Sequence, residues 1–133
     1  TTKVAQACTA NINEEKDFLL VEGAGGFYSP LCEDGLNADL AQTLNLPIIL
    51  VAQNKLGCIN DVLLTVEAIQ SRKLNLLAVI LNQTENTEAN PHMDNEADLK
   101  ELLDYPVFHI PFQQQNTQKK LTPEIIDFIL KQA

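Results

Sequence analysis

A carboxylate that leads directly into a glycine turn is the part of this sequence best suited to chemistry. Glu22 follows the apolar run 18–21 and precedes the turn 23–26, whose sequence is Gly-Ala-Gly-Gly. Glycines let backbone N–H groups approach an anion more closely than a side chain permits. Because a carboxylate repels a phosphate-sized anion, a hard cation such as Mg²⁺ has to lie between the two. The pattern therefore indicates a metal–nucleotide site; a tight turn with a solvated glutamate is the other interpretation that the spacing allows.

Two further polar features also follow apolar runs. The turn 55–60, Lys-Leu-Gly-Cys-Ile-Asn, follows the run 48–52 and begins a predicted helix, whose free N–H groups suit a carboxylate or phosphate. Asn82 follows the run 76–81, and its amide is able to bond either an adenine edge or its own loop. Ligands of parallel sheets bind at the carboxyl ends of the strands, so we expect Glu22, this turn and Asn82 to converge there. An ordinary capped helix would contain the same turn residues.

Apolar runs and helix signals predict the elements that position these residues. Strands are predicted over 18–22, 48–52, 76–81 and 107–110, and helices over 2–12, 38–44, about 60–72, 95–103 and 125–131. The expected helix caps are Asn37, Asn60 or Asp61, and Thr122. Uninterrupted apolar runs indicate strands that are covered on both faces. The alternating order predicts an α/β fold, with a parallel sheet and helices on both of its faces.

Composition limits the classes of protein. A chain of 133 residues with 45% hydrophobic composition fits one domain, residues 1–133. The net charge of −9 argues against a nucleic-acid or anionic-membrane partner, and no apolar run is long enough to cross a bilayer. Cys8, Cys32 and Cys58 are widely spaced and indicate neither a disulfide framework nor a zinc site. Together these features favour the reducing cytoplasm.

The residues around these turns resemble dethiobiotin synthetases. The matching segments are 21–26, 29–31, 38–40, 46–51 and 56–60, and the resemblance extends from the helix before Asp17 to Pro111. The motif Glu-Gly-Ala-Gly-Gly is shared with enzymes that amidate cobyrinic acid. The turn Leu-Gly-Cys-Ile-Asn, in register after it, is much more specific.

This resemblance implies a fold similar to P-loop NTPases and an ATP-dependent ligase. Such an enzyme closes the ureido ring of dethiobiotin from 7,8-diaminononanoate, CO₂ and MgATP. The resemblance implies that Glu22 is an Mg²⁺ ligand and that the nucleotide is bound by Glu22, Gly23, Ala24, Gly25, Asn82, Gln83, Pro111, Phe112 and Gln113. It also implies a homodimer in which the carboxylate of the neighbouring subunit's substrate is held by Leu56, Gly57, Cys58, Ile59 and Asn60.

The P-loop of that family has no counterpart here. None of the five glycines is followed by Lys, so the sequence contains no Walker A motif. Phosphoryl transfer depends on the lysine and the hydroxyl of that motif. We therefore expect the chain to be the carboxyl-terminal part of a larger nucleotide-binding domain, without catalytic residues of its own and inactive alone. The alternative is a non-catalytic dimerising or nucleotide-sensing remnant of the same fold.

Overall fold

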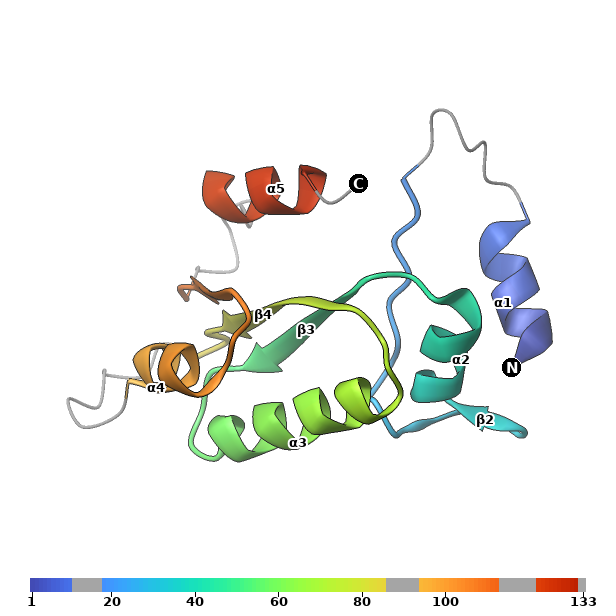
Figure 1. Cartoon of the computed structure of the whole chain (residues 1–133), viewed down its shortest axis with the longest axis horizontal. Coiled ribbons are helices and arrows are strands. Elements are labelled where there is room, and N and C mark those ends of the chain that lie inside the picture. The colour runs from blue at the N-terminus through green and yellow to red at the C-terminus, as the bar shows by residue number, and fades with distance from the viewer. Residues whose placement is uncertain (11–17, 86–93, 113–121, 132–133) are drawn as a thin grey trace.

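A three-stranded parallel sheet forms the centre of the computed structural model, which describes residues 1–10, 18–85, 94–112 and 122–131 (Figure 1). Its strands are β3 (Ile48–Gln53), β4 (Leu76–Asn82) and β5 (Val107–Ile110), with β4 in the middle. The register pairs Asn82 with Gln53 on one side and with Ile110 on the other, so the carboxyl ends of the three strands meet at one edge.

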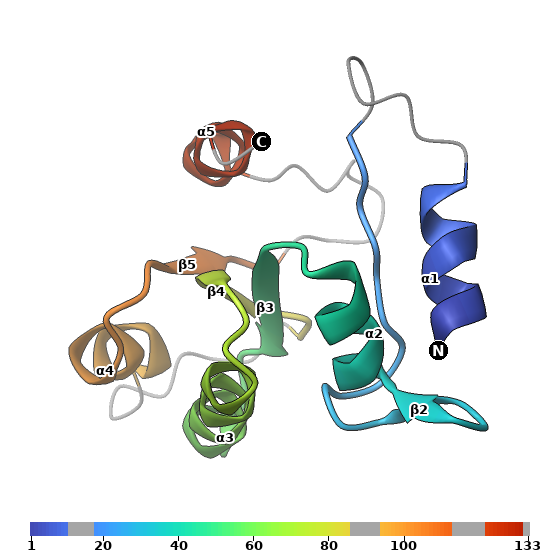
Figure 2. The same cartoon turned by 45° about the vertical axis from the view of Figure 1, so that its right-hand side comes forward.

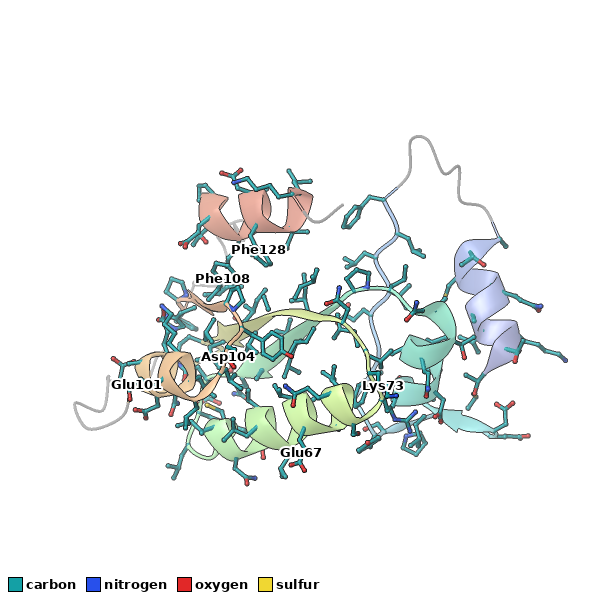
Figure 3. All side chains as sticks on the ribbon, in the orientation of Figure 1. Glu67, Lys73, Glu101, Asp104, Phe108 and Phe128 are labelled. Atoms are coloured by element: carbon teal, nitrogen blue, oxygen red, sulfur yellow. The ribbon has the colours of Figure 1, made fainter. Side chains whose placement is uncertain are left out.

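Helices cover both faces of this sheet. α3 (Cys58–Ser71) and α4 (Asn95–Leu102) lie on one face, and α5 (Pro123–Leu130) lies on the other (Figure 2). Phe108 of β5 and Phe128 of α5, both labelled in Figure 3, are in contact across this second face; their ring centroids are 5.2 Å apart and the rings are tilted by 56°. The prediction of an α/β fold with a parallel sheet and helices on both faces is confirmed.

The hydrophobic core lies between the sheet and the helices α3 and α4. Val79 and Leu81 of β4 and Leu99 of α4 have no exposed surface, and Val62 and Ile69 of α3 are 1% exposed. These side chains belong to one continuous buried cluster. Burial of apolar surface is the main stabilising contribution in such a cluster. In the described segments, no helix combines the length and the apolar composition needed to cross a membrane.

A second group of elements precedes the sheet along the chain. It comprises α1 (Thr2–Thr9), the antiparallel pair β1 (Pro30–Cys32) and β2 (Gly35–Leu36), and α2 (Asn37–Leu44). α1 packs beside α2 (Figures 1 and 2). Arg72, directly after α3, donates to Asp39 at 2.8 Å and to Gln42 at 3.0 Å, and its guanidinium lies 5.4 Å from the centre of the Tyr28 ring. These polar contacts join the two groups.

The predicted strand over 18–22 is not formed in this structure. Residues 18–22 are coil, and Phe18 and Leu20 are 58% and 80% exposed. A strand needs a neighbour that pairs with its backbone N–H and C=O groups. No described strand pairs with this segment; β3 pairs with β4 alone, and its Val51 is 58% exposed. The apolar run was therefore not sufficient to make a strand.

Two of the predicted helix caps are also wrong. α2 begins at Asn37 itself, so its N-cap residue is Leu36. The backbone N–H of Leu36 donates to the Asp39 carboxylate at 2.8 Å. α3 begins at Cys58 after Gly57, whose φ is 89°, so Asn60 and Asp61 both lie in the first turn and neither is the cap. Thr122 does precede α5 as predicted, but its backbone C=O rather than its hydroxyl accepts from the first turn. The remaining strands and α4 lie where the sequence predicted them, whereas residues 11 and 12 of the first predicted helix lie outside the described residues.

Candidate functional site at the carboxyl edge of the sheet

Asn82 lies at the centre of the carboxyl edge of the sheet. Its backbone C=O accepts from the N–H of Asn54 at 2.9 Å, and the next N–H, of Gln83, donates to the C=O of Ile110 at 2.9 Å. The side chain of Asn82 is partly buried and makes no hydrogen bond to the described part of the chain. An amide with a fixed backbone and free donor and acceptor groups is suited to binding the edge of a nucleobase.

The other predicted base contacts lie beside Asn82. Gln83 follows it directly, and its side chain donates to the C=O of Glu85 at 3.0 Å. Pro111 and Phe112 follow Ile110, the residue that pairs with Asn82 across the sheet. Gln113 lies outside the described residues. The structure therefore brings Asn82, Gln83 and the start of the 111–113 segment to one place.

The turn 55–60 leaves the same edge and starts α3. The N–H of Cys58 donates to the C=O of Lys55 at 3.1 Å, and Gly57, with a φ of 89°, has no atom within 4 Å of the position that a Cβ would take. Leu56 is 85% exposed, whereas Cys58 is 2% exposed and anchors the turn in the core. Ile59 is partly buried, and the amide of exposed Asn60 lies 3.4 Å from the carboxylate of Asp61. The turn thus presents an open helix N-terminus, which favours an anion.

Asn95 supports this turn from α4, a role that the sequence analysis missed. Its side-chain NH₂ donates to the side-chain oxygen of Asn54 at 2.7 Å and lies 3.5 Å from the C=O of Lys55. At 6% exposure it is the one buried polar residue in the described part of the chain. Asn at the start of a helix is commonly a surface residue, so no local pattern indicates that this one contacts residues 40 and 41 positions earlier in the chain.

Glu22 lies apart from this edge. The arrowheads of β3 and β4 point to the left in Figure 1, whereas the blue segment 18–23 runs on the right. Glu22 is exposed and makes no hydrogen bond or ion pair with the described residues. The expected convergence of Glu22 with Asn82 and the turn 55–60 is therefore not seen. Its carboxylate is free to accept a cation.

The glycine turn after Glu22 has a defined conformation. Gly25 has a φ of 80°, and a Cβ there would lie 2.7 Å from the hydroxyl of Ser29. That hydroxyl accepts from the N–H of Gly26 at 2.8 Å. The N–H groups of Gly23, Ala24 and Gly25 make no hydrogen bond to the described residues, so these three remain available to an anion.

Two charged groups beside α2, Asp39 and Arg72, shift each other's pKa. The N–H of Leu36 and the guanidinium of Arg72 lower the pKa of Asp39 below its ordinary value of 3.8. The hydrogen bond to Asp39 in turn raises the pKa of Arg72. In the four described segments, no group of three His, Cys, Asp or Glu side chains is placed to hold a metal ion. A bound Mg²⁺ would therefore take most of its ligands from phosphate and water, which is usual for this ion.

Two shallow grooves lie outside the predicted site. One, of about 230 Å³, is lined by α3 and by residues 102–105; the other, of about 580 Å³, lies between α3 and the aromatic pair Phe27 and Tyr28. Neither is lined by a residue that the sequence assigned to nucleotide or substrate binding.

Comparison with known proteins agrees with the motifs. Residues 1–120 match the family model described as an AAA domain. The chain is 39% identical to the ATP-dependent dethiobiotin synthetase BioD of Vesicomyosocius okutanii, over 73% of this chain and 48% of the relative. It is also 39% identical to the enzyme of the same name from Aromatoleum aromaticum, over 79% of this chain and 46% of the relative. The chain thus spans about half the length of the curated relatives that it matches, and the predicted resemblance is confirmed.

Proposed function

Because the chain belongs to the AAA-domain family, whose model its residues 1–120 match, we propose that it forms part of an ATP-dependent dethiobiotin synthetase. The reaction closes the ureido ring of dethiobiotin from 7,8-diaminononanoate, CO₂ and MgATP. The observation that carries this proposal is the 39% identity to two enzymes of that name over about three quarters of the chain. The geometry adds support, because Asn82, Gln83 and Pro111 meet at one sheet edge beside the open turn 55–60.

Each part of the site then has a role. The amide of Asn82, with Gln83 and residues 111–113, binds the adenine. The free N–H groups of the turn 23–25 bind the nucleotide phosphates, and the exposed carboxylate of Glu22 fits an Mg²⁺ ion, which would offset phosphate charge. Because this turn lies apart from the Asn82 edge in the present structure, the proposal requires that the complete protein brings the two together. Because the sequence has no Walker A motif, the lysine and hydroxyl that phosphoryl transfer requires come from another part of the protein.

The assay is dethiobiotin formation by the complete natural protein, with each substrate omitted in turn. Glu22→Gln keeps the side-chain shape but removes the anionic oxygen, so we expect turnover to fall by about tenfold or more across a magnesium titration. Glu33→Gln makes the same charge change at an exposed position of the β1–β2 hairpin and serves as the control. Equal activity of the two variants would show that Glu22 is only a turn residue.

The same proposal includes a homodimer in which the turn 56–60 of one subunit holds the substrate carboxylate of the other. Subunit mixing tests it. In a mixed dimer, one subunit carries Asn60→Ala and the other carries Glu22→Gln. If Asn60 acts in the site of the neighbouring subunit, both defects fall in one site and the other site is intact. Activity should then partly recover. No recovery, with subunit exchange demonstrated, would refute the shared site.

A second candidate is a non-catalytic nucleotide-sensing or dimerising protein. It is favoured by one observation, namely that none of the five glycines is followed by Lys. MgATP binding by the complete natural protein without dethiobiotin formation or ATP hydrolysis would support this candidate over the enzyme.

A further inference from the structure

The side chain of Asn37 crosses from the start of α2 to the glycine turn. Its Nδ2 donates to the C=O of Ala24 at 2.7 Å and to the C=O of Gly26 at 3.0 Å. A nitrogen has to face these two carbonyl oxygens, because an amide oxygen in its place would be repelled by both. The two contacts therefore fix the orientation of the Asn37 amide as well as that of the turn.

The other side of the same amide explains why Gly23 is a glycine. The Oδ1 of Asn37 is buried and has no hydrogen-bond partner in the described part of the chain. A Cβ on Gly23 would lie 3.0 Å from this oxygen and 3.1 Å from the carbon that carries it. The amide thus occupies the space that the missing side chain leaves, and the turn packs directly against α2.

Other contacts secure only the later part of the turn. The hydroxyl of Ser29 accepts from the N–H of Gly26 at 2.8 Å, and the N–H of Asn37 donates to the C=O of Ser29 at 3.0 Å. Within the described residues, the C=O of Ala24 has Asn37 as its one partner. The conformation of the turn next to Glu22 therefore depends on this side chain.

Fixing the Ala24 carbonyl also fixes a backbone donor. The peptide bond is planar and trans, so the N–H of Gly25 points opposite to the C=O of Ala24. Because that C=O points to Asn37, the N–H of Gly25 points away from α2. Gly25 is exposed, and its N–H makes no hydrogen bond to the described residues.

We propose that Asn37 is a positioning residue that aims the Gly25 N–H at the anionic ligand of the turn. The ligand itself rests on the proposed function, in which this turn binds the phosphates of MgATP. Asn37 does not touch the ligand; it acts through the peptide between Ala24 and Gly25. The role differs from the helix cap that the sequence alone suggested for this residue.

The test uses the complete natural protein and measures MgATP affinity by calorimetry, together with the amide NMR signal of Gly25. Asn37→Ala should weaken MgATP binding about tenfold, because a hydrogen bond to a charged group loses its alignment. Asn37→Asp should weaken it further, since a carboxylate would face two carbonyl oxygens near the phosphates. In the wild type the Gly25 signal should shift on adding MgATP, and in both variants the shift should be small.

Two controls separate positioning from a general loss of stability or a change of charge. Val66→Ala removes two buried methyl groups of α3 from the core and should lower the melting temperature without changing MgATP affinity. Asn75→Asp adds the same negative charge at an exposed loop position and should also leave affinity unchanged.

The outcomes also separate this inference from the proposed function. Wild-type affinity in Asn37→Ala, or dethiobiotin synthesis with no response of the Gly25 signal to MgATP, overturns the inference and leaves the proposed function standing. A wild-type protein that does not bind MgATP at all overturns both.

Discussion

The sheet region and the turn region of this molecule are held together by different forces. The sheet region, β3 to β5 with α3 and α4, has a continuous apolar core in which Val79, Leu81 and Leu99 are fully buried. The turn region, residues 22–39, is fixed by polar contacts of Asn37, Ser29 and Asp39, most of them partly exposed. In the sheet region each single apolar contact contributes little, so the loss of one contact has a small effect. In the turn region a few directional hydrogen bonds determine the conformation, so the loss of one can change it.

This difference agrees with the work that each region is proposed to do. The sheet region provides a fixed backbone, so that Asn82 and Pro111 keep their relative positions through the register of β4 and β5. The turn region has to present free N–H groups to a ligand, which a buried apolar packing does not allow. Stability and binding are therefore expected to respond to substitutions in different regions.

The largest effect on stability is expected from Leu99→Ala. Leu99 of α4 has no exposed surface, so the substitution leaves a cavity in the core and should lower the free energy of unfolding by about 2–5 kcal/mol. Leu102→Ala, in the same helix but at a side chain that is 57% exposed, is the matched control and should cost much less. Urea unfolding measures both. Similar losses at the two positions would mean that the sheet region has no specifically packed core at α4.

A smaller loss is expected from Gly25→Ala in the turn region. Its φ of 80° is unfavourable for a residue with a Cβ, and that Cβ would lie 2.7 Å from the Ser29 hydroxyl. Adopting this conformation costs about 1–2 kcal/mol for a non-glycine residue. Gly26→Ala is the control, because its nearest contact would be 3.7 Å and its φ is not positive.

If thermal melting shows equal losses for these two glycine variants, the turn does not hold the conformation described here. If both variants are instead as costly as Leu99→Ala, the contrast between the two regions fails.

The ion pair of Asp39 predicts a pH dependence that belongs to the turn region. The pKa of Asp39 is lowered in the folded protein, first by the Leu36 N–H and then by Arg72, from an ordinary value of 3.8. A carboxyl whose pKa is lower in the folded state stabilises it above the unfolded pKa, and this contribution is lost as the pH falls from about 4 through the folded pKa. Asp39→Asn should therefore reduce the fall in stability on the acid side.

The control is Asp98→Asn, which removes an exposed acid of α4 that makes no ion pair with the described residues. Melting temperatures between about pH 3 and pH 6 compare the two variants with the wild type. If the melting temperature of Asp39→Asn falls with decreasing pH as steeply as that of the wild type, Asp39 does not contribute to holding α2 to α3.

The sheet region was also much easier to predict from the sequence than the turn region. β5 occupies the predicted residues, and α4 begins at Asn95 as predicted; its cap, Asp94, was not singled out in the sequence, and the Asp94 carboxylate accepts from the N–H of Ala97 at 3.0 Å. Such signals are local, since the residues that make them lie within one turn of helix or one strand. The edge formed by Asn82 and its neighbours followed from the parallel order of the strands.

The turn region depends on contacts between distant residues, which a local pattern does not encode. Asn is a residue type that favours helix caps, but the side chain of Asn37 bonds to residues 11 and 13 positions earlier in the chain. The run 18–22 has the composition of a buried strand, but composition does not supply a pairing partner. The strands of the β1–β2 hairpin contain three and two residues, too few for a periodic pattern to appear.

The smallest effect on stability is expected from Asn60→Ala, although the same substitution should affect substrate binding. If Asn60 capped α3, its loss would cost about 1 kcal/mol. The helix instead begins at Cys58, and the exposed amide of Asn60 has one weak contact at 3.4 Å, so the melting temperature should barely change. In the complete natural protein the Michaelis constant for the diamine substrate should rise, because a polar contact to its carboxylate is lost. Gln70→Ala, which removes an exposed amide near the other end of α3, controls for the loss of a polar side chain from this helix. A lowered melting temperature with an unchanged Michaelis constant would assign Asn60 to the stability of α3 and remove it from the substrate site.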